Sequence, residues 1–150
     1  MIDIPRYKKI VAETIIFDLN GTLAIDGKVD REVLDMLNTL NKKYKIVILT
    51  ADTFGTVKRM FNEYNNITVE IINTMDEKTQ VAKRYSPYIA IGNGNNDVDV
   101  FKNSELSIAI MNREGCSTKA LFSADVVVNN IIDAIGLLLN EKRLIATLRE

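Results

Sequence analysis

Four polar stretches of this 150-residue chain each follow an apolar run, and they hold the residues that could do chemistry. Asp18 ends the first run, within the sequence Phe-Asp-Leu-Asn-Gly-Thr. Thr50 ends the second, Lys78 lies beyond the third, and a loop at 92–97, reading Gly-Asn-Gly-Asn-Asn-Asp, follows the fourth. Ligands of open α/β sheets bind outside the carboxyl ends of the strands. We therefore expect the four stretches to meet in one crevice.

Phosphoryl transfer is the chemistry that these residue types predict. The carboxylate of Asp18 can act as a nucleophile, as in enzymes that form an aspartyl-phosphate. The hydroxyl of Thr50 and backbone N–H groups at Gly21 and Ala51 can hold phosphate oxygens. Lys78 would offset the negative charge of the phosphoryl group and of Asp18.

A magnesium site is predicted beside the nucleophile. Mg²⁺ prefers oxygen ligands and commonly takes one or two carboxylates together with substrate phosphate and water. Asp18 and Asp97 supply two carboxylates. The amide oxygen of Asn93 and a backbone carbonyl at Asn20 add neutral ligands. The expected cofactor is therefore Mg²⁺, and the expected partner is a phosphorylated substrate.

The composition excludes several other mechanisms. The chain has no His, which excludes Ser-His-Asp triads, Cys-His pairs and His-ligated zinc. Its single cysteine, Cys116, excludes an intramolecular disulfide and a cysteine metal cluster. Nineteen basic and twenty acidic side chains give a net charge of −1, so neither nucleic acid nor a membrane surface is an expected partner.

Length and hydropathy predict a cytoplasmic protein of ordinary globular type. The chain is 47% apolar and 26% charged, and its length suits one domain over residues 1–150. No apolar run approaches the ~18 residues of a transmembrane helix. The first ten residues lack the apolar core of a signal peptide.

The elements that would position the polar stretches alternate as in a parallel α/β sheet. Apolar runs predict strands at 14–17, 45–49, 67–72, 88–91, 106–110 and 125–128. Most runs are continuously apolar, which suits strands covered on both faces. Amphipathic segments predict helices at 31–43 after an Asp30 cap, 53–64, 75–85, 96–102, 117–122 and 131–149. The predicted fold is a three-layer, Rossmann-like α/β sandwich with a mostly parallel sheet.

Two small hairpins are expected outside this pattern. The first pairs residues 2–4 with 9–12 around Pro5-Arg6-Tyr7, ahead of the first core strand. The second spans residues 22–29 and turns at Asp26-Gly27, a dipeptide typical of tight hairpin turns.

At these residues the chain resembles the haloacid dehalogenase (HAD) superfamily of phosphatases, mutases and P-type ATPase phosphorylation domains. That family's pattern is an apolar strand ending Asp-x-Asp-x-Thr, a strand-end Thr or Ser, a helical Lys and a Gly-Asp-Gly-x-x-Asp loop. The chain has the four stretches in the same order, between residue 14 and about residue 128. Its loop at 92–97 and the strand after it look closest to the small soluble P-type-ATPase-like branch.

The resemblance implies roles for individual residues. It implies Asp18 as the nucleophile, Thr50 as a phosphate ligand and Lys78 as the helical lysine. It implies Asn93 and Asp97 as the pair on the metal side. The activity implied is that of a Mg²⁺-dependent phosphatase.

Two positions depart from the family pattern. The usual second Asp, which acts as general acid and base, is Asn20, and the usual first Asp of the loop, a direct Mg²⁺ ligand, is Asn93. An amide cannot donate and retrieve a proton at neutral pH. Because general acid–base help is typically worth ~10²–10⁴-fold, we expect activated phosphates to be favoured. We also expect Asn93→Asp to tighten Mg²⁺ binding.

Three alternatives stay open from the sequence. Lys83 lies on the same predicted helix as Lys78 and competes with it for the site. The chain could also be an attenuated HAD-like domain that binds metal, phosphate or a protein partner with little turnover, or a structural subunit. The intervals 19–49 and 51–77 leave no room for a cap domain. Capless members of the family act on large substrates or close the site with another subunit, which implies a bulky substrate or a homo-oligomer.

Overall fold

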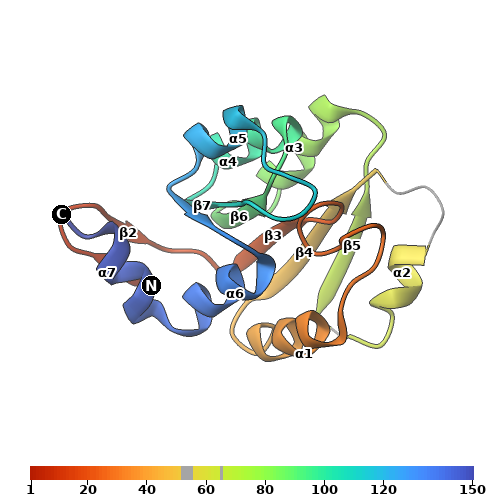
Figure 1. Ribbon diagram of the computed structural model, residues 1–150, viewed down its shortest axis with the longest axis horizontal. Coiled ribbons are helices and arrows are strands. Elements are labelled where there is room, and N and C mark those ends of the chain that lie inside the picture. Colours follow the sequence, from red (N-terminus) through yellow and green to blue (C-terminus); the bar gives the residue numbers. More distant parts are fainter. Residues whose placement is uncertain (52–55, 65) are drawn as a thin grey trace.

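A parallel sheet forms the centre of the computed structural model, which describes residues 1–51, 56–64 and 66–150. Its strands are β3 (Thr14–Asp18), β4 (Lys45–Thr50), β5 (Ile67–Ile71), β6 (Tyr88–Gly92), β7 (Leu106–Ile110) and β8 (Val126–Val128). Their order is β5-β4-β3-β6-β7-β8, and every neighbouring pair is parallel (Figure 1). β3 therefore lies inside the sheet between β4 and β6, at the point where the strand order reverses.

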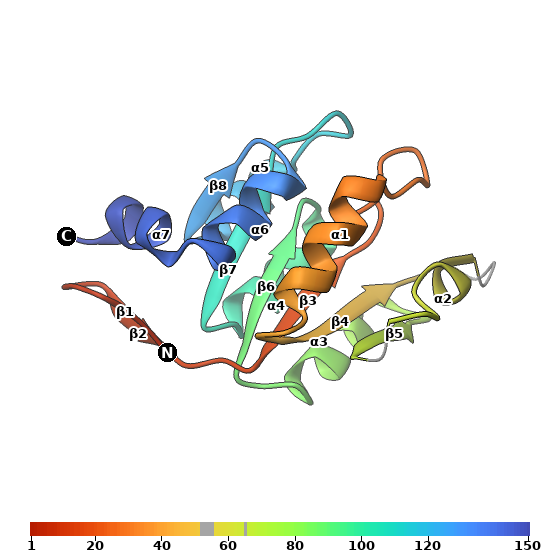
Figure 2. The ribbon, with the colours of Figure 1, turned by 90° about the horizontal axis from the view of Figure 1, so that it is seen from below.

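Helices cover both faces of the sheet, as its continuously apolar strands require. On one face lie α1 (Arg31–Leu40) and α6 (Ile131–Leu139) (Figure 2). On the other lie α3 (Met75–Lys83), α4 (Val98–Lys102) and α5 (Thr118–Ser123). One core cluster joins α1 and α6 to side chains such as Ile15 and Ile46, and a second joins α3, α4 and α5 to Ile16 and Val47. The predicted three-layer α/β fold is confirmed.

The helical segments differ from the sequence prediction at three places. The helix predicted at 131–149 is two helices, α6 and α7 (Glu141–Leu148), because the backbone leaves helical geometry at Asn140 with φ −124° and ψ 82°. The helix predicted at 31–43 ends at Leu40, followed by a turn. The helix predicted at 53–64 is observed as α2 (Thr56–Met60), and positions 53–55 lie outside the described residues. A short 3₁₀ turn, η1 (Asn95–Asp97), precedes α4.

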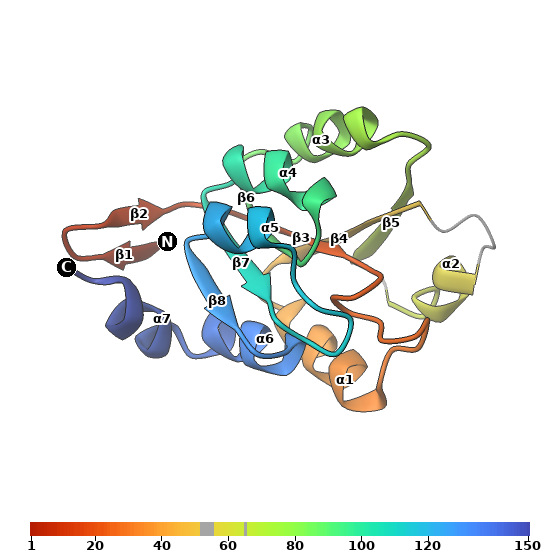
Figure 3. The same ribbon diagram turned by 45° about the horizontal axis from the view of Figure 1, so that its top comes forward.

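The two hairpins have different outcomes. The first is confirmed: β1 (Ile2–Ile4) pairs antiparallel with β2 (Lys8–Ile10) and lies beside α7 (Figure 3). The second is reduced to one antiparallel bridge between Ile25 and Lys28, around a turn in which both central residues have positive φ. None of the helices in the described ranges combines the length and hydropathy needed to cross a bilayer.

Candidate active site

A crevice of about 320 Å³ opens at the carboxyl ends of β3, β4 and β6. Six of the predicted site residues line it: Asp18, Asn20, Thr50, Ala51, Lys78 and Asn93. The parallel register explains this convergence, since it brings the last residues of neighbouring strands to one edge. The four polar stretches of the sequence thus meet in one place.

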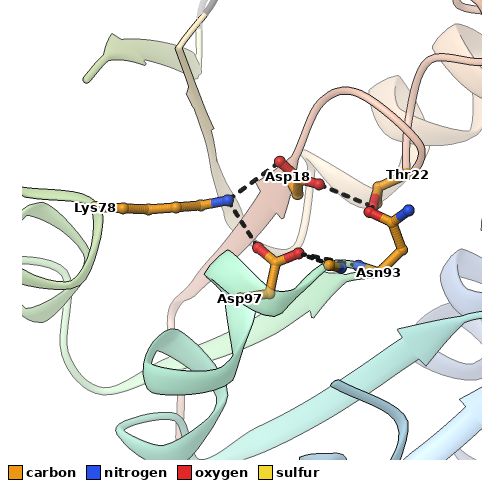
Figure 4. A network of polar contacts seen from close by, with 6 residues as sticks. Asp18, Thr22, Lys78, Asn93 and Asp97 are labelled. Carbon is orange, nitrogen blue, oxygen red and sulfur yellow. Dashed lines mark hydrogen bonds and ion pairs between the residues drawn. The ribbon is translucent and has the colours of Figure 1, made fainter. Parts of the chain in front are cut away.

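Lys78 is the centre of the polar network in this crevice (Figure 4). Its side chain is 2% exposed, and its Nζ lies 3.1 Å from Asp18 Oδ1 and 2.7 Å from Asp97 Oδ1. It lies on the first turns of α3, whose start is fixed because Thr74 Oγ1 accepts a hydrogen bond from the Glu77 N–H at 3.2 Å. Lys83 is exposed near the other end of the same helix. In this structure Lys78, not Lys83, contacts the site.

Asp97 does not line the crevice but is buried behind Lys78 and the loop after β6. Its side chain is 3% exposed, and its Oδ2 accepts hydrogen bonds at 3.0 Å from the backbone N–H groups of Asn93 and Gly94. The carboxylate lies so close to Gly92 that a Cβ there would be 2.4 Å from it, which explains the glycine. Both oxygens of Asp97 are therefore engaged, one with Lys78 and one with the loop. This geometry does not support the expectation that Asp97 faces a metal ion.

The pKa of Asp18 is raised from 3.8 to about 7. Burial is the main cause and the nearby Asp97 carboxylate adds to it, while Lys78 and the Leu19 N–H oppose the shift. Burial alone would lower the pKa of Lys78, but the two carboxylates outweigh burial and raise it. When Asp18 is ionised, two carboxylates share one ammonium group, which leaves the site an excess of negative charge.

One oxygen of Asp18 and one oxygen of Asn93 approach the same buried hydroxyl group, that of Thr22. Asp18 Oδ2 and Asn93 Oδ1 each lie 3.4 Å from the hydroxyl oxygen of Thr22, which is fully buried (Figure 4). One carboxylate oxygen and one amide oxygen, beside an excess negative charge, are a donor set that suits a hard cation. The residues present therefore fit Mg²⁺, with fewer charged ligands than the sequence predicted.

The loop after β3 departs from one further expectation. The Gly21 N–H, which was predicted to hold a phosphate oxygen, donates to the Ala24 carbonyl at 2.8 Å in this structure. Gly21 has φ +81°, and a Cβ there would lie 2.4 Å from the side-chain nitrogen of Asn93. The positive φ and the close approach of Asn93 both require glycine at this position. Asn20, next to it, is exposed at the crevice mouth.

Two contributors escaped the sequence analysis, Thr22 and Asn112. Thr22 had a signal, because it occupies the fifth position of the Asp18 stretch, but no role was assigned to it. Asn112 donates a hydrogen bond to the Gly21 carbonyl across 91 residues of sequence, and no local pattern marks such a contact. A second cavity, of about 830 Å³, has Thr22, Lys28 and Arg113 among the residues that line it.

Two archaeal proteins from Methanocaldococcus jannaschii are similar to the chain in sequence. The uncharacterized protein MJ0073 is 53% identical over 62 residues, which are 41% of this chain and 67% of that protein. The uncharacterized protein MJ0072 is 49% identical over 39 residues, which are 26% of this chain and 89% of that protein. No family model matches the chain.

Solved structures with the same arrangement of strands and helices include a phosphatase and a transport ATPase. One is 3-deoxy-D-manno-octulosonate 8-phosphate phosphatase from Moraxella catarrhalis, in complex with magnesium and phosphate ions. It has a TM-score of 0.65 and 17% identity over 92% of this chain and 94% of its own. The other is a zinc-transporting PIB-type ATPase, with a TM-score of 0.63 and 19% identity over 80% of this chain and 20% of its own.

Proposed function

Because the chain belongs to one family with MJ0073 and MJ0072 and has the haloacid dehalogenase fold, we propose that it is a Mg²⁺-dependent phosphohydrolase with Asp18 as nucleophile. The observation that carries this proposal is the buried Lys78 ammonium, which contacts both Asp18 and Asp97 at the floor of the crevice. A buried lysine shared by two carboxylates beside an open crevice suits a site that receives a phosphate group.

The proposed reaction has two steps. In the first, a carboxylate oxygen of Asp18 forms a bond to phosphorus while the bond from phosphorus to the leaving-group oxygen breaks. In the second, water attacks the phosphorus of the aspartyl-phosphate, which releases inorganic phosphate and restores the carboxylate. Lys78 and Thr50 hold the phosphate oxygens in both steps. Asp18 and Asn93 would hold Mg²⁺, which when bound supplies positive charge to the phosphate.

The identity of residue 20 predicts which substrates react. Asn20 cannot protonate a departing oxygen by ionisation, so alkyl phosphates, which leave as strongly basic alkoxides, react slowly. Aryl phosphates, acyl phosphates and phosphoanhydrides leave as weakly basic anions and react faster. The same deficit slows the hydrolysis of the aspartyl-phosphate, because no base at position 20 activates the water. The proposed substrate is therefore an activated phosphate, and the proposed phosphoenzyme is long-lived.

The test compares leaving groups in two proteins. For the wild type, log(kcat/KM) for a series of phosphate esters is expected to fall steeply as the pKa of the leaving group rises. In Asn20→Asp the dependence is expected to flatten, with a gain of up to ~10²–10⁴-fold for alkyl phosphates. A flat dependence in the wild type would contradict the role assigned to Asn20, since another group would then handle the leaving oxygen.

Asn20 and Asn93, which replace two aspartates of the family pattern, also favour a second candidate function, a domain that binds phosphate or metal with little turnover. Detection of a phosphoenzyme distinguishes an enzyme from such a binding domain. If the chain is an enzyme, labelled phosphate from an aryl phosphate becomes protein-bound and hydroxylamine releases it, because an acyl phosphate is labile to this nucleophile. Asp18→Asn is expected to abolish the labelling. Phosphate binding by calorimetry without any labelling would favour the binding domain.

The crevice mouth suggests a bulky substrate or a second copy of the chain. Asn20, Ala51 and Asn96 are exposed at its rim, so the site is wet unless something covers it. Light scattering and a comparison of phosphopeptides with small esters test this proposal. A monomer that prefers small esters would contradict it.

A further inference from the structure

The loop at residues 111–117, which follows β7, contacts both sides of the crevice mouth. Its Asn112 side chain donates to the Gly21 carbonyl on the β3 side. Its Ser117 N–H donates to the Asn93 carbonyl at 2.8 Å on the β6 side. Its Gly115 carbonyl accepts a hydrogen bond from Asn93 Nδ2 at 3.0 Å. The loop therefore holds the backbone and the side chain of Asn93 together.

The contact with the Gly115 carbonyl distinguishes an amide from a carboxylate. Only an amide has an N–H group to give to a carbonyl, whereas an ionised carboxyl group has acceptors alone. A carboxylate at position 93 would bring two oxygens together at the place where this hydrogen bond now lies. The lost bond would be replaced by repulsion, at the position that ties the loop to the site.

The same contact fixes the direction of the Asn93 oxygen. Because Nδ2 points to the Gly115 carbonyl, Oδ1 is turned to Thr22 and the Asp18 side of the crevice (Figure 4). The nitrogen also packs on the open face of Gly21, where a Cβ would be 2.4 Å away. The amide is thus held from both sides, between two glycines.

The charges around position 93 also favour an amide there over a carboxylate. Asp18 and Asp97 already share the single ammonium of Lys78. A carboxylate at position 93 would face Asp18 across Thr22 and add a second uncompensated negative charge. Such a site would need a cation to keep its shape. With Asn93 the described contacts are satisfied by the protein alone.

We infer that Asn93 is a positioning residue that preorganises the crevice in the absence of a bound cation, and that the 111–117 loop is matched to an amide at this position. The inference goes beyond the proposed function, because it concerns the metal-free protein and requires no turnover. It also adds a cost to the expected tightening of Mg²⁺ binding by Asn93→Asp. The carboxylate must first overcome its repulsion from the Gly115 carbonyl.

The experiment compares the melting temperature and the hydrogen exchange of backbone amides, each with a chelator and with excess Mg²⁺. The variants are Asn93→Asp, Asn93→Ala and the control Asn96→Asp. Asn96→Asp adds the same charge to the same loop, and among the described residues no hydrogen bond involves the exposed Asn96 side chain. None of these readouts depends on phosphatase activity, so a failed activity screen leaves the inference intact.

In chelator, Asn93→Asp is expected to melt about 5 °C below wild type and to exchange the 112–117 amides about tenfold faster. Mg²⁺ is expected to restore most of both losses in Asn93→Asp while changing the wild type little. Asn93→Ala is expected to lose the loop contact without recovery by Mg²⁺, because it adds no charge.

Two results would overturn the inference. One is a metal-free Asn93→Asp protein that melts and exchanges like Asn96→Asp. The other is a wild type that gains as much from Mg²⁺ as Asn93→Asp does. If Asn93→Asp fails to fold without metal, Asn93→Ala decides, and unchanged exchange at 112–117 in that variant overturns the role of the amide.

Discussion

Two aspartates of this protein each lie 3.1 Å from a lysine, and their carboxyl groups behave in opposite ways. Asp18 contacts Lys78 at the carboxyl edge of the sheet, and its pKa is raised to about 7. Asp125 contacts Lys8 near the amino ends of β7 and β8, and its pKa is lowered. An ion pair of the same length therefore does not decide the protonation state of the acid.

The charged and hydrogen-bonding neighbours of each carboxylate explain the difference. Burial raises the pKa of both acids. Around Asp125, hydrogen bonds from the Tyr7 hydroxyl, Ser107 and Lys8 outweigh burial. Asp18 shares its lysine with a second carboxylate, Asp97, whose negative charge raises the pKa further, and its other donors are the Leu19 N–H and the Thr22 hydroxyl at 3.4 Å. The Asp125 cluster is satisfied and holds the hairpin to the sheet, whereas Asp18 retains capacity for a cation or a phosphate.

The largest expected effect separates the two aspartates by activity. Asp18→Asn is expected to lower kcat for an aryl phosphate by at least about 10⁴-fold, because the proposed nucleophile is removed. Asp125→Asn makes the same chemical change at a structural pair and is expected to keep kcat within about threefold at a temperature where it stays folded. Steady-state assays with Mg²⁺ measure both. Equal losses would mean that Asp18 acts through stability alone.

The second effect separates the two lysines by stability. Lys78→Met leaves two buried carboxylates without their shared cation and is expected to lower the free energy of unfolding by about 3 kcal/mol at pH 7. Lys8 is 32% exposed, and Lys8→Met is expected to cost about 1 kcal/mol or less. Urea unfolding followed by circular dichroism gives both values. A small cost for Lys78→Met would show that water replaces its ammonium.

The third effect is a difference in how the stability of the protein depends on pH, measured without metal. The folded state keeps the Asp18 proton to about pH 7, whereas the unfolded chain loses it near 3.8, so stability falls as pH rises between these values. Asp125 acts with the opposite sign: its stabilisation is present above its ordinary pKa and is lost as pH falls through its lowered folded pKa. Asp18→Asn is expected to remove about 4 kcal/mol of the fall towards neutral pH. Asp125→Asn is expected instead to weaken the loss of stability at acid pH, in a plot of the free energy of unfolding against pH.

The smallest expected effect concerns the Tyr7 hydroxyl, one of the hydrogen-bond donors in the Asp125 cluster. Burial and the bond to Asp125 raise the pKa of the Tyr7 hydroxyl to about 12. Tyr7→Phe removes that hydrogen bond and is expected to cost about 1 kcal/mol of stability. The pKa of Asp125, measured by NMR titration, is expected to rise in this variant, and kcat is expected to stay unchanged. An unchanged Asp125 pKa in Tyr7→Phe would show that Ser107 and Lys8 are sufficient to lower it.

The sequence predicted the parts of the site that lie at the ends of apolar runs. Asp18, Thr50 and Asn93 each end or follow a buried strand, and parallel strands must bring such residues to one edge. The position of Lys78 was chosen over that of Lys83 by family pattern, and its burial agrees with the choice. What local pattern could predict was therefore which segments meet, rather than how their side chains are oriented.

Orientation depended on contacts between distant segments. Asp97 turns away from the crevice because the Lys78 ammonium, 19 residues away in the sequence, binds one of its oxygens, while nearby loop amides bind the other. The helix break at Asn140 likewise depends on tertiary packing, since α7 contacts β1 rather than continuing along the sheet. Neither the contact between Lys78 and Asp97 nor the packing of α7 on β1 can be predicted from a window of neighbouring residues.

The long sequence separations within the site have a consequence for the order of folding. Sixty residues separate Lys78 from Asp18, and 71 separate Asn93 from Thr22. Contacts of this range form slowly, because the entropy of closing a long loop must be lost before the contact stabilises anything. A chain in which only β3 and β4 have paired holds Asp18 in water, with an ordinary carboxylate. The raised pKa of Asp18 arises only when α3 and the loop after β6 pack against it, so this residue acquires its unusual acidity at a late step of folding.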